Sequence, residues 1–295
     1  MSKSQRQDKK PLTKKQKIVI AVVVVLSVCI ATAAIAVPLY WHFASTPKCV
    51  GEKEYSYTTT EMHVEHDGIN LYGNILVPNG ESGQKYPAVI YAHGAGSNWE
   101  YEISTLQCLA MSGIVCYAFD FYGWSDKCTG PKNGDWFRGT SFADVAAYQQ
   151  QVLEQVKDLN AAIEHIKSLE YVDANNVFLL GSSMGGATAA TCAITHNADV
   201  RGIILQFPAT FFMTEPTVDG SAYDVNRYTG KVLILQGAKD DLVTLSMAQE
   251  LATHYNKYVE HCRLVVYKNQ QHVFDGKYRI VAARDAYKFI KNNLI

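Results

Sequence analysis

A serine flanked by glycines follows a short apolar run near the middle of the chain. Residues 177–186 read VFLLGSSMGG, with Ser183 at the centre of a Gly-x-Ser-x-Gly pattern and Ser182 directly before it. In a tight turn between a strand and a helix, small neighbours let the backbone pack closely and leave the serine hydroxyl exposed. The following helix would direct its positive end toward Ser183. We interpret Ser183 as a nucleophile; the alternative is an ordinary glycine-rich turn.

A serine hydroxyl needs a base to take its proton, and the chain has nine histidines. His272 follows the apolar run 264–267 and precedes the last helical segment, so it lies just beyond a strand. The other histidines fall where packing or surface roles are more common. An acid should orient the imidazole, and Asp240 and Asp241, which follow the run 232–235, could each do so.

An oxyanion would need two backbone N–H donors. We assign one to Met184, directly after the serine, and the other to Ala95 in the loop His93-Gly94-Ala95-Gly96. The glycines of that loop free its backbone to turn inward. His93 is then a structural residue rather than a base.

These side chains can meet only if several strands end at one edge of a sheet. Alternating runs at 55–66 and 69–77 flank Asp67-Gly68, a dipeptide suited to a hairpin. Apolar runs typical of buried parallel strands occupy residues 88–92, 114–119, 177–180, 203–206, 232–235 and 264–267. Helical spacing covers residues 101–111, 144–169, 184–196, 247–258 and 278–293. The pattern predicts an α/β domain with a mostly parallel sheet and helices on both faces.

The N-terminal segment differs from the rest. Residues 1–17 are strongly basic, and residues 18–37 are an uncharged apolar run followed by Tyr40 and Trp41. About 20 apolar residues in a helix cross the hydrocarbon core of a bilayer, and the basic flank keeps the N-terminus cytoplasmic. We expect a basic stem (1–17), a transmembrane signal-anchor helix (18–41), a linker (42–54) and an extracytoplasmic domain (55–295). The alternative is a cleaved signal peptide, because residues 31–36 contain Ala-x-Ala patterns.

Composition excludes several classes of protein. The chain has 295 residues, 48% of them hydrophobic, and a formal net charge of −1, which argues against a disordered chain and against nucleic acid as a partner. Seven cysteines show neither CxxC nor zinc-ligand spacing. Six lie beyond the apolar run and could form disulfides, although Cys108, Cys116 and Cys192 stand in apolar surroundings that favour burial. We expect no metal and no cofactor.

Four motifs together resemble the α/β-hydrolase superfamily over about residues 55–295: GSSMG at 181–185, HGAG at 93–96, GAKDDLV at 237–243 and NQQHVF at 269–274. The resemblance is greatest to the dienelactone-hydrolase, serine-aminopeptidase and cinnamoyl-esterase-like group. It implies an eight-stranded sheet and assigns the acid to Asp240, with Asp241 as the fallback. Two features depart from the family or limit it. Residues 120–125 lack the second glycine of the family's D-x-x-G-x-G-x-S loop, and the short interval before Asp240 leaves only about residues 210–228 for a cap.

Aromatic residues in the predicted loops suggest a substrate-binding surface. The candidates are Trp99, Tyr122, Trp124 and Phe211, with Tyr101 and Phe212 nearby. Ordinary packing under the loops is the alternative for each. The sequence predicts a membrane-anchored serine hydrolase that acts on small carboxylic esters. A serine peptidase acting on short peptides is the nearest alternative, and a non-catalytic tethered binding domain is the alternative of another class.

Overall fold

The computed structural model describes residues 44–131, 143–196, 200–215, 218, 220–258 and 260–295. It separates into two units, Met1–Ser45 and Thr46–Ile295, and the features below belong to the second unit. The expected basic stem and transmembrane helix, residues 1–41, lie outside the described residues. Among the helices that are described, none has the length and apolar character needed to cross a bilayer.

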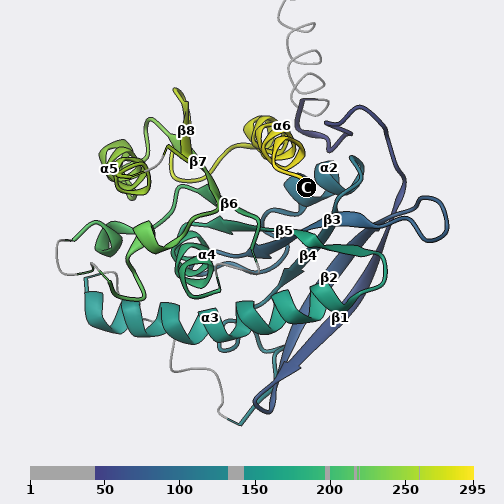
Figure 1. Ribbon diagram of the computed structural model, residues 1–295, viewed down its shortest axis with the longest axis horizontal. Coiled ribbons are helices and arrows are strands. Elements are labelled where there is room, and N and C mark those ends of the chain that lie inside the picture. Colours follow the sequence, from purple (N-terminus) through teal and green to yellow (C-terminus); the bar gives the residue numbers. More distant parts are fainter. Residues whose placement is uncertain (1–43, 132–142, 197–199, 216–217, 219, 259) are drawn as a thin grey trace, which may run out of the picture. The chain divides into compact units, whose positions relative to one another are not determined.

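Eight strands form a single sheet in the order β1-β2-β4-β3-β5-β6-β7-β8 (Figure 1). They are β1 (Tyr57–His66), β2 (Ile69–Pro78), β3 (Tyr86–Ala92), β4 (Val115–Phe119), β5 (Val172–Ser182), β6 (Gly202–Gln206), β7 (Lys231–Gly237) and β8 (Cys262–Tyr267). β2 pairs antiparallel with both β1 and β4, and all other pairs are parallel. The predicted mostly parallel, eight-stranded α/β-hydrolase sheet is therefore confirmed.

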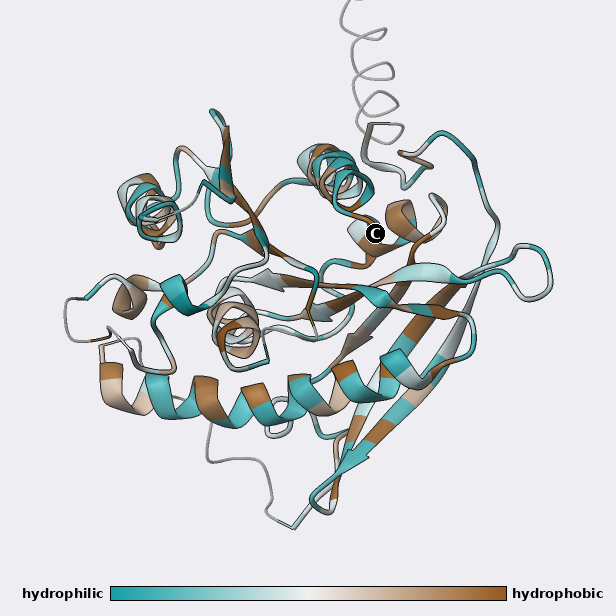
Figure 2. Cartoon of the chain, in the orientation of Figure 1, coloured by the Kyte–Doolittle hydropathy of each residue, from teal (hydrophilic) through white to brown (hydrophobic). Residues whose placement is uncertain are grey.

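The hairpin between β1 and β2 turns where the sequence predicts. Asp67 has φ 47° and Gly68 has φ 76°, so two successive residues adopt the positive φ values that a tight hairpin turn requires. The strands β4 and β6 are buried along their whole length, and brown segments mark the apolar parts of the central strands in Figure 2. Strands covered on both faces need apolar side chains in both directions, which explains their continuous apolar runs.

Helices cover both faces of this sheet (Figure 1). The helices α2 (Ile103–Ala110) and α6 (Gly276–Asn292) contribute to one apolar cluster, and α3 (Val145–Ser168), α4 (Met184–Thr195) and α5 (Leu245–Tyr255) contribute to the other. Asp144, Thr244 and Asp275 cap the N-termini of α3, α5 and α6 by accepting backbone N–H groups. The small residues of α4 let it lie buried between α3 and the sheet.

Two expectations differ from the structure in detail. The strand β5 begins at Val172 rather than at residue 177, because Val172 pairs with Tyr86 across a register shift that the mostly polar residues 173–176 conceal. Between β6 and β7 the described residues hold two short 3-10 helices, Phe211–Met213 and Val225–Arg227. The six cysteines of the described part form no disulfide, and Cys108, Cys116 and Cys192 are buried.

Candidate active site

Ser183 occupies a strained turn between β5 and α4. Its backbone has φ 53° and ψ −116°, a conformation that costs about 1–3 kcal/mol in a residue other than glycine. Backbone hydrogen bonds hold it there: its N–H donates to the carbonyl of Gln206 (3.0 Å), and its own carbonyl accepts from Gly186 (2.9 Å), Ala209 (3.0 Å) and Ala187 (3.3 Å). A Cβ on Gly185 would collide with the carbonyl oxygen of Ala92, so the turn requires glycine there.

The side chains of Ser183, His272 and Asp240 form a continuous hydrogen-bonded chain. The Oγ of Ser183 lies 3.0 Å from Nε2 of His272, and Nδ1 of His272 lies 2.9 Å from Oδ2 of Asp240. An ionised carboxylate can only accept hydrogen bonds, so Nδ1 carries the proton and Nε2 accepts the hydroxyl of Ser183. The structure thus brings together residues that are 89 and 32 positions apart in sequence.

Asp240 is held ionised by its surroundings. Burial raises the pKa of this carboxyl, but the hydrogen bonds from His272 and from the backbone N–H groups of Val243 (2.8 Å) and Leu242 (3.0 Å) outweigh burial and leave its pKa below the ordinary value. Gln236 adds a further donor, with its Nε2 3.0 Å from Oδ2 of Asp240. The neighbouring Asp241 is exposed.

The loop after β3 is organised by His93. Its Nδ1 lies 2.8 Å from the carbonyl oxygen of Gly94, and its Nε2 accepts the N–H of Phe121 at 3.1 Å. Burial lowers the pKa of His93, so the ring is neutral and donates through Nδ1. The carbonyl of Gly94 and the N–H of Ala95 belong to one peptide plane, and fixing the first fixes the second.

Two backbone donors remain available at this site. Across the residues that the structure describes, neither the N–H of Ala95 nor that of Met184 donates to a protein acceptor. Ala95 lies in a turn closed by a 3.3 Å hydrogen bond from the N–H of Ser97 to the carbonyl of Gly94, with Gly96 at φ 68°. Met184 is the first residue of α4, where backbone N–H groups have no partner within the helix.

A cavity of about 290 Å³ opens beside the hydroxyl of Ser183. Its described lining consists of Gly94, Ala95, Gly96, Ser97, Asn98, Tyr101, Ser182, Ser183, Phe207, His272 and Val273. Phe207, at φ 38°, packs its ring 4.9 Å from that of His272. The cavity therefore combines the serine, the imidazole and one candidate donor with three apolar or aromatic walls.

None of the four aromatic residues proposed for substrate binding lines this cavity. Trp99 and Trp124 line a neighbouring groove of about 680 Å³, which meets the cavity at Gly96, Ser97 and Asn98. The N–H of Trp99 is tied to the carboxylate of Asp120 at 2.8 Å, outside the cavity. Tyr122 is buried, and Phe211 stacks on Tyr148 with ring centroids 5.6 Å apart. Ordinary packing explains the last two.

Sequence reasoning missed Phe207, Val273 and Gln236. Val273 adjoins His272, and Phe207 directly follows β6, so position at the end of a strand was the available signal. Gln236 carried a clearer signal, because it is a polar residue inside the apolar run VLILQG, and a fully buried amide needs partners. Its Nε2 also donates to the carbonyl of Val243 at 2.8 Å, which closes the loop around Asp240.

No group of three or more His, Cys, Asp and Glu side chains in the described segments has a metal-binding arrangement. A hydroxyl, a neutral imidazole and an ionised carboxylate in series can move a proton away from the serine oxygen.

Comparisons with known proteins bear on the fold and on the family of the chain. The model of the serine aminopeptidase family S33 matches residues 83–223. The quorum-quenching protein AidA of Acinetobacter baumannii is 26% identical over 125 residues, which are 42% of this chain and 36% of that protein. The chain therefore spans only about a third of the length of this curated relative.

Solved structures show the fold at low identity. Est1E of Butyrivibrio proteoclasticus with ferulic acid bound has a TM-score of 0.60 and 18% identity over 79% of this chain and 98% of that chain. Dienelactone hydrolase of Anabaena variabilis has a TM-score of 0.61 and 17% identity, over 81% of this chain and 99% of that chain. Dipeptidyl peptidase 4 of Porphyromonas gingivalis has a TM-score of 0.59 and 22% identity, over 82% of this chain and 36% of that chain. The chain therefore has the α/β-hydrolase fold, and its residues 83–223 are similar to the serine aminopeptidases of family S33.

Proposed function

We propose that the protein hydrolyses carboxylic esters of small molecules through a Ser183–His272–Asp240 triad. One observation carries the proposal: Ser183, His272 and Asp240 lie in a single hydrogen-bonded chain, at 3.0 and 2.9 Å, beside a cavity. The strained backbone of Ser183 supports it, because strain that the surroundings enforce is typical of functional sites.

The reaction follows from these positions. His272 Nε2 takes the hydroxyl proton while Ser183 Oγ bonds to the ester carbonyl carbon, and the carbonyl oxygen becomes an oxyanion held by the N–H groups of Ala95 and Met184. The carbon–alkoxide bond then breaks, and the alcohol leaves with the proton from His272. Water repeats the sequence on the acyl-enzyme, releasing the acid and restoring Ser183. Asp240 orients His272 and stabilises its charged form.

Ester rather than peptide hydrolysis is supported by the extent of the structural similarity. The esterase and the dienelactone hydrolase are matched over 98% and 99% of their chains, whereas the peptidase is matched over 36%. The aligned region therefore corresponds to nearly the whole of the two small proteins and to only part of the peptidase chain. The cavity of about 290 Å³ also suits a small group.

The experiment compares p-nitrophenyl acyl esters with aminoacyl p-nitroanilides, using the full-length chain and Ser183→Ala. We expect turnover of the short-chain esters, slower or no turnover of the anilides, and loss of both in the variant. Preferential cleavage of the anilides would establish the peptidase alternative. A wild-type protein without activity on either substrate, but with measurable ligand binding, would favour the non-catalytic binding domain.

We further propose that residues 18–41 anchor the protein in a membrane, with the N-terminus cytoplasmic and the catalytic domain outside. The uncharged apolar run and its basic flank support this arrangement. Extraction of membranes at alkaline pH should leave the full chain in the pellet, and external protease should degrade the catalytic domain of intact cells. A mature chain that begins after residue 33 or 36 would instead indicate a cleaved signal peptide.

A further inference from the structure

Arg279, in the first turn of α6, bridges two loops that meet at the cavity. Its Nη1 donates to the carbonyl of Tyr101 at 2.5 Å, and its Nε donates to the carbonyl of Phe274 at 3.3 Å. The guanidinium also lies over the ring of Tyr101, 4.6 Å from the centroid. A single planar side chain thus joins residues 178 and 5 positions away along the chain.

The positive charge of Arg279 is matched by a buried carboxylate. Glu102 has no exposed surface, and its Oε1 lies 3.9 Å from Nε of Arg279. Its Oε2 accepts the hydroxyl of Thr105 at 2.6 Å, whereas Oε1 has no hydrogen bond to any described residue. Burial raises the pKa of Glu102, and the guanidinium opposes that rise. The pair is therefore fixed in place, because separating it would leave a charge buried without a partner.

Each loop that Arg279 holds contributes a wall of the cavity. Tyr101 lines it from the side of the β3 loop, and His272 and Val273 line it directly before Phe274. The centroid of the Phe274 ring lies 4.9 Å from that of Phe207, and the centroid of the Phe207 ring also lies 4.9 Å from that of His272. A shift of Phe274 would reach His272 both through the backbone and through Phe207.

We propose that Arg279 is a positioning residue, which sets the place of His272 relative to Ser183 and the width of the cavity between Tyr101 and Val273. The proposal rests on the proposed hydrolase function. Lysine cannot replace it, because a single ammonium does not present the planar fork that reaches two carbonyl groups and stacks on a ring.

The test uses full-length Arg279→Lys and Arg279→Ala, with Arg284→Lys as the matched control on an exposed position of the same helix. We expect kcat/KM for a p-nitrophenyl ester to fall about 10- to 100-fold in both Arg279 variants, because small misplacements of reacting groups carry costs of this size. The rate of Ser183 labelling by a fluorophosphonate should fall with it, and Arg284→Lys should match the wild type.

A second measurement separates positioning from general stability. Millimolar ethylguanidine should restore part of the activity and labelling rate of Arg279→Ala while its melting temperature stays unchanged, and should not affect Arg284→Lys. The inference would be overturned if folded Arg279→Lys had wild-type rates. It would also be overturned if an Arg279 variant had a lower melting temperature but unchanged activity per labelled site and no rescue. Absence of turnover and labelling in the wild type would instead overturn the proposed function.

Discussion

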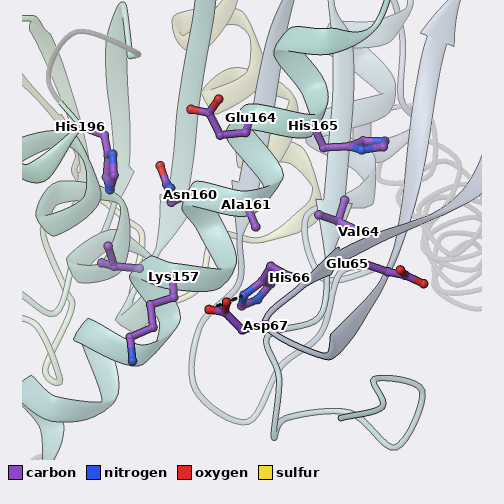
Figure 3. Close-up of a pocket in the computed structure, with 11 residues that line it drawn as sticks. Val64, Glu65, His66, Asp67, Lys157, Asn160, Ala161, Glu164, His165 and His196 are labelled. Atoms are coloured by element: carbon purple, nitrogen blue, oxygen red, sulfur yellow. Dashed lines mark ion pairs between the residues drawn. The ribbon is translucent and has the colours of Figure 1, made fainter.

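Two histidine–aspartate pairs in this molecule have nearly the same geometry and different surroundings. His272 lies 2.9 Å from Asp240, and His66 lies 2.8 Å from Asp158. Both carboxylates also accept a backbone N–H group: Asp240 accepts that of Val243, and Asp158 accepts that of Tyr122 at 2.9 Å. The pairs differ in what the other ring nitrogen faces: for His272 it is the hydroxyl of Ser183, and for His66 it is a second carboxylate, that of Asp67, at 3.6 Å (Figure 3).

Their cavities show that volume does not identify the site. The space beside His66 is about 550 Å³, with Lys157, Asn160 and Glu164 of α3 on one side and His196 on another (Figure 3). The space beside Ser183 is about 290 Å³. A base needs a proton donor within reach, and only the smaller cavity places a hydroxyl against an imidazole. The His66 pair instead links the end of β1 to α3 and to the loop after β4.

The largest contrast should come from removing the nucleophile. Ser183→Ala should lower kcat on p-nitrophenyl acetate by about 10⁴-fold or more, because the triad acts as a unit. Ser182→Ala is the matched control, since its hydroxyl donates to Oε1 of Gln206 and not to His272. Steady-state rates measured on equal amounts of folded protein decide the matter, and equal losses in both variants would contradict the assignment.

The two aspartates should respond in opposite ways to the same substitution. Asp240→Asn should lower kcat by about 10³- to 10⁴-fold with little change in melting temperature, because an amide no longer fixes the imidazole tautomer. Asp158→Asn should leave kcat within a few-fold and lower the melting temperature instead. If Asp158→Asn cost as much activity as Asp240→Asn, the distinction between the two pairs would be wrong.

The His66 pair should make stability depend on pH. The hydrogen bond to Asp158 raises the pKa of His66 in the folded protein. The contribution of the pair to the free energy of unfolding is therefore complete below the pKa of His66 in the unfolded chain, about 6.5, and is lost as the pH rises through the higher pKa of the folded protein. His66→Gln should therefore destabilise the protein by roughly 1 kcal/mol more at pH 5.5 than at pH 8.5. Urea unfolding at both pH values tests this prediction. An equal loss of stability in His66→Gln at both pH values would show that the charge of His66 does not contribute.

Substitutions in the walls of the cavity should have the smallest effects on activity. Val273→Ala should raise KM for butyrate relative to acetate esters by about 2- to 10-fold with little change in kcat, because it removes apolar contact with the acyl or alcohol group. Trp124→Ala, in the neighbouring groove, should not change that ratio. A larger effect from Trp124 would indicate that small esters occupy the groove.

The helices and strands, and two of the three side chains of the proposed triad, could be predicted from the sequence because each has a local signature. Ser183 stands in a strand–turn–helix pattern, and His272 follows a strand. Asp240 could be separated from Asp241 only through a resemblance, since the difference lies in which carboxylate receives the N–H groups of Leu242 and Val243. Placement of Trp99 at the cavity failed for a similar reason, because the course of a loop depends on tertiary contacts such as the hydrogen bond from the backbone N–H of Trp99 to Asp120.

The most direct test of the account is the site of covalent labelling. The purified full-length chain, in detergent, is treated with a fluorophosphonate and digested, and the modified residue is identified by mass spectrometry. We predict one adduct, on Ser183, that forms at least about 10³-fold more slowly in His272→Ala, where the base is gone. An unmodified wild-type protein, or an adduct on another residue, would contradict the account.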